Sequence, residues 1–501
     1  MHQLTGNIIL DIVFWNDCPN YDDVPIPLLF RYIGPYKLAF WARSHGYQAQ
    51  VIDYVMDFSE EELWSLTTKF ISDKTLILGI SATFLFGKKL IDPITGKTRL
   101  ISREMYNVLK RIKDSYPHIK IIIGGYMAEI VSGFGLADAI VTGHAEDILL
   151  ELLDHYKKQT APPKSKMHVT FYGKKNILQY YEANQKKFNI EGDNFKFSKQ
   201  DCILPNDTLP LEISRGCIFK CKFCSYPLLG RGKLDYLRDM ECIKEELLYN
   251  YETFGTTRYY VLCDTFNDTE YKVNKWYKMV SSLPFEINYS AYLRADLIHK
   301  YPDMAYQLQE SGLFGAFHGL ESLHLDASKL VGKGWSGKHA REFIPFLYHD
   351  LWKGKVPQTL AFIVGLPGED IDSLQQTMEW FKENKLYHLK FNNLLVSKTQ
   401  PENHRSEFSR DAEKYGFKWN ENGWYNEEWN FKRALQVTQE LTAELKDHNK
   451  VGIWGLFSLL ALGYDKQEFL IKTLPQFDWK VDFRSRRSRY LENYKNKLRE
   501  L

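Results

Sequence analysis

The sequence predicts an α/β protein in which an N-terminal doubly wound, Rossmann-like parallel sheet precedes an open barrel of six βα units and a helical C-terminal region. Short apolar runs rich in β-branched residues alternate with longer amphipathic stretches, which is typical of parallel sheets covered by helices. The chain has 501 residues, which is more than a single hydrophobic core usually stabilises. We therefore expect four parts, at residues 1–157, 158–210 (a linker), 211–395 (the barrel) and 396–501 (a cap).

The first part is predicted from its alternation of elements. Strands are expected at 7–14, 49–54, 75–81, 119–124 and 138–142, and helices at 31–45, 60–72, 101–116 and 145–157. Ligands of such sheets bind beyond the carboxyl ends of the strands. This rule places Ser81, Gly124 and Gly125 around one crevice, where glycine allows the backbone to approach a bulky ligand closely.

The middle of the chain changes in character at residue 158. Residues 158–210 are polar and interrupted by proline, which indicates a linker with one helix near 177–188. The barrel is predicted from strands at 211–215, 257–263, 286–292, 313–320, 357–365 and 388–395, with its active site at their carboxyl ends. The remainder is rich in tryptophan (Trp419, Trp424, Trp429 and Trp454) and is expected to cover the open side of the barrel.

Composition excludes several classes of protein. The chain has 65 basic and 63 acidic residues, so it lacks an overall electrostatic footprint for nucleic acid. Its seven cysteines are an odd number, which argues against a secreted disulfide framework. The apolar run at 451–464 is too short to span a bilayer. We expect a cytoplasmic protein without a membrane partner, and we favour a solvated helix over a nucleic-acid contact for the arginine-rich tail at 480–490.

Three cysteines, Cys217, Cys221 and Cys224, follow the first predicted barrel strand. A cubic iron–sulfur cluster normally takes four thiolates, so three would leave one iron free to bind a small molecule. The alternative is a structural zinc site, which needs a fourth Cys or His. The next cysteines are Cys242 and Cys263, far from finger-like spacing, so the sequence favours the cluster.

The cysteine motif, with Phe223 just before its last cysteine, resembles the signature of the radical S-adenosylmethionine (SAM) enzymes. The resemblance implies that the three cysteines hold a 4Fe–4S cluster, that SAM binds its open iron, and that an electron donor such as flavodoxin or ferredoxin reduces it to generate a 5′-deoxyadenosyl radical. It also implies SAM-binding roles at the strand ends: Phe223 near the adenine, Asp264 at the methionyl amine, Arg294 at the carboxylate, Ser290 and Glu321 at the ribose, and Gly365 behind the adenine.

The first domain is similar to the cobalamin-binding domain that precedes the radical domain in many radical SAM enzymes. The similarity runs through Gly79-Ile-Ser81, Ile123-Gly-Gly125 and Asp138–Glu146. The Asp-x-His-x-x-Gly motif, whose histidine ligates cobalt in classical cobalamin domains, is absent from the chain. Two interpretations therefore stay open: a cobalamin bound without that histidine, or a flavodoxin-like domain that holds no cofactor or presents a substrate.

The resemblance favours a cobalamin-dependent radical SAM enzyme that methylates a carbon atom of an unidentified substrate. One alternative is a radical SAM enzyme without a corrinoid, of the cyclase, rearrangement or methylthiotransferase type. A methylthiotransferase would carry three more cluster cysteines in its N-terminal domain, where this chain has only Cys18. The non-enzymatic alternative is a metal-stabilised nucleic-acid-binding protein. The sequence assigns no catalytic residue and does not determine the substrate or the oligomeric state.

Overall fold

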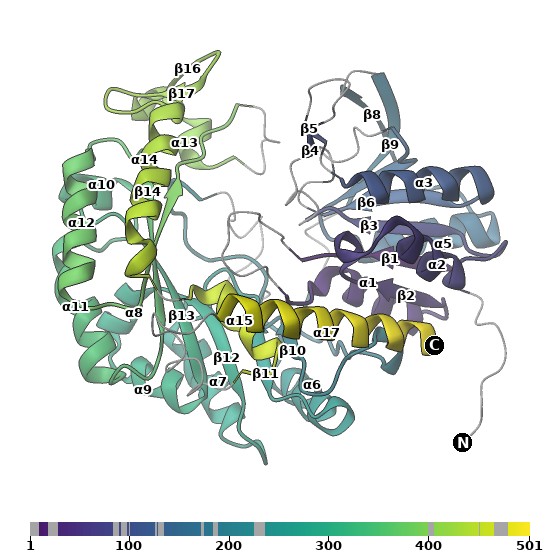
Figure 1. The fold of residues 1–501 in the computed structure, drawn as a ribbon, viewed down its shortest axis with the longest axis horizontal. Helices are drawn as coiled ribbons and strands as arrows, with labels where there is room; N and C mark the ends of the chain where they lie inside the picture. Colours follow the sequence, from purple (N-terminus) through teal and green to yellow (C-terminus); the bar gives the residue numbers. More distant parts are fainter. Residues whose placement is uncertain are drawn as a thin grey trace.

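The computed structural model describes residues 10–18, 29–83, 90–91, 98–99, 101–125, 128, 135–171, 175–183, 189–224, 236–398, 405–449, 451–464 and 479–501. Two sheets organise these residues, one of seven strands and one of six. Figure 1 shows the two sheets side by side, with the N-terminal part of the chain in one and the middle part in the other.

The first sheet has the strand order β2-β1-β3-β6-β7-β9-β8, and its strands from β2 to β9 pair in parallel. Helices cover both faces: Leu63 and Leu109 pack on one face, and Ala39 and Leu152 on the other. The prediction of a doubly wound sheet is confirmed. Its elements are β1 (Ile12–Trp15), α1 (Ile33–Ser44), β2 (Ala49–Ile52), α2 (Glu60–Phe70), β3 (Ile77–Ser81), α3 (Arg103–Ser115), β6 (Lys120–Gly124), β7 (Ala139–Thr142) and α5 (Glu146–Lys158), with a short hairpin of β4 (Leu90–Ile91) and β5 (Thr98–Arg99).

The helix predicted near 177–188 is wrong. A hairpin of β8 (Lys166–Phe171) and β9 (Lys175–Glu182) occupies this segment, and β9 pairs in parallel with β7. Leu178 and Tyr181 of β9 are buried. Aromatic and β-branched residues suit a strand that can complete the open edge of a sheet, and that edge exists only in the folded protein.

The second sheet has six parallel strands in chain order, β10 to β15, which confirms the predicted partial barrel. The strands are β10 (Thr208–Leu211), β11 (Arg258–Val261), β12 (Asn288–Leu293), β13 (Leu313–Glu321), β14 (Gln358–Val364) and β15 (His388–Asn393). The helices are α6 (Met240–Phe254), α7 (Glu270–Val280), α8 (Ala295–Lys300), α9 (Asp303–Glu310), α10 (Leu325–Leu330), α11 (Gly337–Phe346) and α12 (Ile371–Glu383). The first strand lies earlier than predicted, because the chain leaves the sheet after Leu211.

The C-terminal region packs against the barrel. Its elements are α13 (Glu407–Arg410), β16 (Lys418–Asn420), β17 (Gly423–Tyr425), α14 (Phe431–Glu444), α15 (Ile453–Ala461) and α17 (Trp479–Glu500). Asn449 exchanges two hydrogen bonds with the backbone of Leu389, 2.8 and 2.7 Å long, and so satisfies the free edge of β15. Trp424 and Trp429 are buried, Trp419 is half-buried, and the side chain of Trp454 lies outside the described residues.

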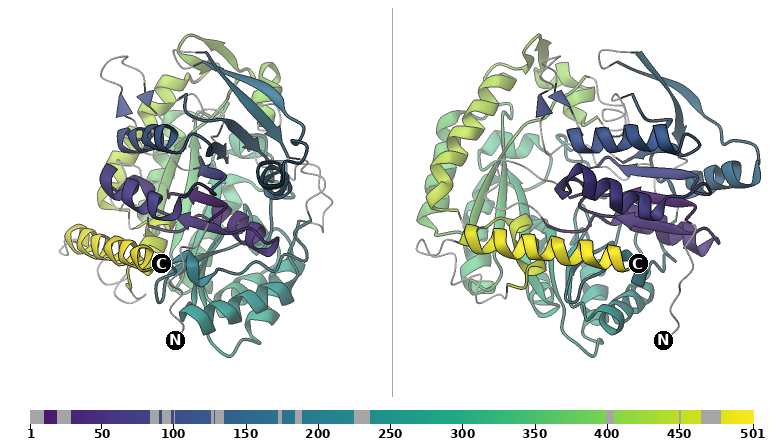
Figure 2. Two further views of the ribbon diagram at one scale, coloured as in Figure 1. Left: turned by 90° about the vertical axis from the view of Figure 1, so that its right-hand side faces the viewer. Right: turned by 45° about the vertical axis from the view of Figure 1, so that its right-hand side comes forward.

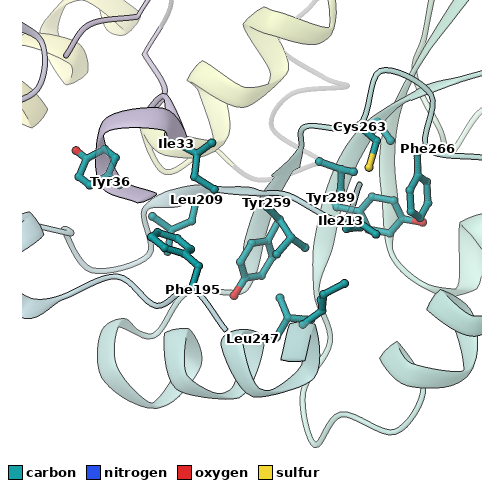
Figure 3. Packing of buried hydrophobic residues seen from close by; sticks show 14 of the residues in the cluster. Ile33, Tyr36, Phe195, Leu209, Ile213, Leu247, Tyr259, Cys263, Phe266 and Tyr289 are labelled. Carbon is teal, nitrogen blue, oxygen red and sulfur yellow. The ribbon is translucent and has the colours of Figure 1, made fainter. Parts of the chain in front are cut away.

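A shared core and one long helix join the two sheets. Figure 3 shows Ile33 and Tyr36 of α1 in the same apolar cluster as Phe195, Leu209 and residues of the barrel strands. Figure 2 shows α17 running alongside both sheets. Within the described part of the chain, no helix combines the length and the apolar character that crossing a membrane requires.

Candidate active site

The three cysteines lie on the loop that follows β10, at the carboxyl end of the barrel. Main-chain hydrogen bonds hold this loop: Lys222 N–H donates to Val331 O (3.1 Å), and the Lys222 carbonyl accepts from Phe408 N–H (2.9 Å). Within the loop, Cys224 N–H donates to the Cys221 carbonyl (3.0 Å). All three cysteine side chains are partly exposed. The loop therefore presents three accessible thiols on an anchored backbone.

Polar groups from neighbouring strand ends approach the cysteine sulfurs. The Cys217 thiol donates to Thr265 Oγ1 (3.4 Å), and Arg294 Nη1 donates to Cys221 Sγ (3.6 Å). Among the described residues, no three Cys, His, Asp or Glu side chains converge as they would on a single metal ion. The thiolates of a 4Fe–4S cluster each bind a different iron and need no common point, so this donor set fits a cluster.

Arg294 is fixed against the cysteine loop. Its guanidinium lies 4.0 Å from the centre of the Phe219 ring, and its Nη2 donates to Asp296 (2.7 Å) and to the Lys333 carbonyl (2.7 Å). Asn267 exchanges two hydrogen bonds with the Arg294 backbone. Every guanidinium nitrogen has a partner, so a ligand carboxylate at Arg294 would have to share it with Asp296. The predicted carboxylate contact stays a prediction, and the structure adds a second role as a cation beside the thiols.

Phe223 is connected to Glu321 through a lysine that the sequence did not single out. Lys333 Nζ donates to Glu321 Oε1 (2.7 Å) and to the Gly319 carbonyl (2.5 Å), and it lies 5.9 Å from the centre of the Phe223 ring. Glu321 has a left-handed backbone, with φ +67°. Such strain in a non-glycine residue concentrates at functional sites. The pair thus connects the end of β13 to the cysteine loop.

Asp264 lies beyond the end of β11, beside the start of the cysteine loop. Its side chain is open to solvent, yet desolvation by surrounding protein raises its pKa to about 6, against the favourable charge of Lys272 and a hydrogen bond from Gly216 N–H. The position agrees with a ligand-facing role for Asp264.

Two of the predicted SAM contacts lie in packed surroundings. Ser290 is fully buried four residues before Arg294, about 13 Å back along the strand, at a level where Leu456 of α15 also packs. Gly365 has φ +106°, and a Cβ there would meet Trp424 at 2.6 Å. Packing against Trp424 explains the glycine at 365, whereas the buried Ser290 Oγ has no hydrogen-bond partner among the described residues, and the predicted contacts of both residues with SAM remain untested.

Ser81, Gly124 and Gly125 lie together at the carboxyl ends of β3 and β6, and this part of the first sheet is called the glycine edge below. Ser81 and Gly124 are paired neighbours on β3 and β6, and Ala82 N–H donates to the Gly124 carbonyl (2.7 Å). Gly125 has φ +98°, and a Cβ there would meet Thr83 Oγ1 at 2.5 Å. Among the residues that the structure describes, a Cβ at Gly124 would meet only the Val141 carbonyl, at 3.6 Å. Gly125 is thus required by its own turn, whereas Gly124 leaves space at the strand edge.

An arginine joins this edge to the cysteine loop. Arg215, two residues before the first cysteine, pairs with Glu212 (2.6 Å) and with Glu146 at the start of α5 (3.2 Å), and it donates to His144 Nδ1 (2.9 Å). Arg215 and Lys37 hold the pKa of Glu212 well below its usual range despite burial. The loop after β7 and the cysteine loop are therefore held together by charge.

Sequence reasoning missed Arg215 and also Tyr32. Burial raises the pKa of Tyr32, opposed by a hydrogen bond with Thr83, and the charges of Glu212, Arg215 and Asp264 also act on it. The tyrosine thus lies between the glycine edge and the barrel. The local signals were an arginine beside the cysteine motif and the glutamate three residues before that arginine, whereas His144, Glu146 and Thr83 are distant in sequence from the residues they contact.

Comparison with known proteins assigns the class. Residues 211–381 match the Radical SAM superfamily, which uses a 4Fe–4S cluster and SAM. An uncharacterised methyltransferase of Pyrococcus horikoshii is 23% identical over 330 residues, or 61% of this chain and 67% of that protein. The ribosomal protein uS12 methylthiotransferase RimO of Methylorubrum populi is 26% identical over 202 residues, which span 37% of this chain and 43% of RimO.

Solved structures match nearly the whole chain. The radical SAM methyltransferase TsrM from Kitasatospora setae, solved with cobalamin and a 4Fe–4S cluster, has a TM-score of 0.61 at 13% identity and covers 98% of this chain and 100% of its own. The cobalamin-dependent SAM radical enzyme OxsB has a TM-score of 0.59 at 15% identity and covers 97% of this chain and 71% of its own. Residues 211–381 of the chain thus match the Radical SAM superfamily, and nearly the whole chain shares the fold of the cobalamin-dependent radical SAM enzymes TsrM and OxsB.

Proposed function

We propose that the protein is a cobalamin-dependent radical SAM methyltransferase that transfers a methyl group to a carbon atom. The fold is shared with TsrM over nearly the whole chain, and the structure of TsrM holds cobalamin and a 4Fe–4S cluster. The observation that carries the proposal is the charged junction through Arg215, because it holds the loops at the two strand edges together. Methylation of a substrate with the help of two cofactors requires that both cofactor sites lie within reach of the same substrate.

In this proposal Cys217, Cys221 and Cys224 hold the cluster, and Arg294 offers a charged hydrogen bond to the middle one. Hydrogen bonds to cluster sulfurs tune the reduction potential. Together with SAM, the bound cluster supplies one-electron cleavage of a carbon–sulfur bond. The residues proposed to contact SAM are Phe223, Asp264, Ser290, Arg294, Glu321 and Gly365. An electron donor such as flavodoxin or ferredoxin belongs to the same proposal.

The glycine edge would hold the corrinoid, which supplies a carrier for the methyl group. Ser81 and Gly124 lie next to each other there, and Gly124 leaves room for a bulky ligand to approach the backbone. Thr83 fills the position where a side chain on Gly125 would lie, so Gly125 acts by shaping the turn. We also propose that domains extend over residues 1–157, 211–395 and 396–501, with the β8–β9 hairpin contained in the connecting segment 158–210.

The similarity to RimO favours a second candidate, a methylthiotransferase. That similarity covers 37% of this chain. The first 157 residues contain one cysteine, Cys18, which is fully buried. A second cluster there would lack its ligands, so we rank this candidate below methyl transfer.

The test is corrinoid binding by variants of the glycine edge. Gly124→Val adds a side chain into the space at the strand edge and should weaken saturable binding of hydroxocobalamin about 5- to 160-fold, because overpacking costs about 1–3 kcal/mol. Gly192→Val is the matched control, since Gly192 is exposed and a Cβ there would meet no atom of the described residues within 4 Å. Absence of saturable binding to the parent protein under anaerobic conditions would contradict the proposal.

A further inference from the structure

Lys390 lies on the inner face of the barrel. Its neighbours on β15, Leu389 and Phe391, belong to the apolar cluster that includes Met378 of α12, so they face the outer helices. Side chains alternate between the two faces of a strand. Lys390 therefore points to the opposite side, into the barrel, where it is half-buried.

The strand register places Lys390 in the layer of the cysteine loop. Lys390 pairs with Ala361 on β14, Ala361 pairs with Gly319 on β13, and the residue before Gly319, His318, pairs with Leu293. One step beyond Leu293 is Arg294, which contacts the cysteine loop. Lys390 thus lies at the level of the barrel where the site opens, on the strand farthest from the first.

The other cations in this layer have counter-ions. Arg294 pairs with Asp296 (2.7 Å), and Lys333 pairs with Glu321 (2.7 Å). No ion pair or hydrogen bond involves the Lys390 ammonium within the described chain, and burial alone lowers its pKa below the ordinary value. A desolvated charge without a partner is costly to the folded state. An aliphatic residue, like Ile363 in the next layer of β14, would avoid that cost.

We propose that Lys390 binds a carboxylate of the substrate, so that the substrate of the methyl transfer is a carboxylate-bearing small molecule held inside the barrel. This inference rests on the proposed function. A single ammonium matches the single charge of a carboxylate, whereas a phosphate carries about −1.5 to −2 and commonly recruits several donors. Binding would supply the missing counter-ion and fix one end of the substrate opposite the cysteine loop.

The first test uses a metabolite extract divided on a strong anion-exchange resin at about pH 11, where amines are largely neutral and the carboxylate gives even an amino acid a net negative charge. The reconstituted holoenzyme receives SAM with a trideuterated methyl group, and products are found by their mass. The proposal predicts a labelled product from the retained fraction. Lys390→Met should lower kcat/KM for the substrate that gives this product about 10- to 100-fold, mainly by raising KM, as expected for loss of a hydrogen bond to a charged group. Lys390→Arg should recover part of the lost kcat/KM. Lys432→Met, on the exposed face of α14, is the control.

A labelled product from the unretained fraction alone would overturn the carboxylate inference and leave methyl transfer intact. If neither fraction yields a product, the proposed methyl transfer fails, and a second experiment then decides the role of Lys390. The holoenzyme is treated with limiting acetic anhydride, and acetylation of Lys390 is measured by mass spectrometry. The retained fraction should protect Lys390 and spare the exposed Lys432. Equal acetylation with both fractions, or no acetylation of Lys390 in their absence, would overturn the inference.

Discussion

Glu369 is a buried carboxyl group without a cationic partner among the residues that the structure describes. It is 1% exposed, and its Oε1 accepts a hydrogen bond from Ser322 Oγ (2.7 Å). Desolvation raises its pKa to about 8, with a smaller contribution from the charge of Asp370. The folded protein therefore keeps Glu369 protonated at neutral pH, whereas in the unfolded chain Glu369 has the ordinary glutamate pKa and is ionised at neutral pH.

This difference makes stability depend on pH. The unfolded chain has the ordinary glutamate pKa of about 4.3, so between this pH and the folded pKa of Glu369 the folded state binds one more proton than the unfolded state. The free energy of unfolding therefore falls by up to about 1.4 kcal/mol per pH unit as the pH rises through this range. Above the folded pKa it no longer changes with this group. Glu369→Gln removes this pH-dependent contribution to the free energy of unfolding and keeps an oxygen that accepts a hydrogen bond from Ser322. The melting temperature of the variant relative to the parent should rise from pH 5 to pH 9. Exposed Glu383→Gln should show no such trend, and a constant difference for Glu369→Gln would contradict the assignment.

The three cysteines of the loop should be individually necessary for the cluster. Replacement of Cys217, Cys221 or Cys224 by alanine leaves an iron without its thiolate, so the visible charge-transfer absorption after anaerobic reconstitution should be lost. Cys242→Ala is the control, because Cys242 lies on α6, outside the loop. Iron and sulfide analysis provides an independent measurement. A full cluster in Cys221→Ala, or its loss in Cys242→Ala, would show that the ligands are misassigned.

At the scale of elements, the turn after β14 is shaped by the β16–β17 hairpin. Gly365 and Gly368 both have positive φ, but among the described residues an added Cβ would meet a neighbour within 4 Å only at Gly365, where the Trp424 ring of β17 lies 2.6 Å away. Trp424 Nε1 also donates to the Leu394 carbonyl (3.1 Å) beyond β15, which fixes its position. The hairpin thereby supports two adjacent strand ends of the barrel.

Gly365→Ala should destabilise the protein more than Gly368→Ala. Both substitutions force alanine into a left-handed backbone, at about 1–2 kcal/mol, but only the first adds a clash, which typically costs about 1–3 kcal/mol more. Melting temperatures of the two variants give the comparison. Trp424→Phe in the Gly365→Ala background should recover part of the loss. Equal destabilisation by the two glycine substitutions would exclude the proposed contact.

At the scale of the whole molecule, one buried arginine connects three distant segments. Arg31 donates to Asp207 (2.9 Å) and to the Cys202 carbonyl (2.8 Å), and its guanidinium lies 5.1 Å from the centre of the Tyr494 ring on α17. Tyr490 of α17 donates to Asp207 as well (2.9 Å). The N-terminal sheet, the connecting segment and the last helix are thus held by one network.

Arg31→Met should loosen this assembly. The substitution leaves Asp207 buried without its cation, and breaking a buried pair in this way costs about 3–5 kcal/mol. We expect a lower midpoint in urea and faster proteolysis within α17, followed by mass spectrometry. Arg489→Met is the control, because Arg489 is exposed on the same helix. Unchanged proteolysis of α17 would show that Arg31 does not anchor this helix.

Local patterns predicted most of the fold. The barrel strands were located to within a few residues, since alternating apolar runs and helical stretches are local properties. The first strand was placed too late because residues 212–215, although strand-like, leave the sheet to form the Glu212–Arg215 ion pair. The β8–β9 hairpin was missed because its stability depends on the open edge of β7.

By itself, the sequence determined most of the order of elements, apart from the β8–β9 hairpin, and the place of the three-cysteine loop after the first barrel strand, because both depend on neighbours along the chain. Only the tertiary structure decided which side chains meet. It gave every guanidinium nitrogen of Arg294 a partner, enclosed Ser290 in packed surroundings, joined Arg215 to Glu146 and left Lys390 facing the barrel without a counter-ion among the described residues. The physical reason is that burial and charge pairing depend on segments far apart in sequence, and folding alone brings those segments together.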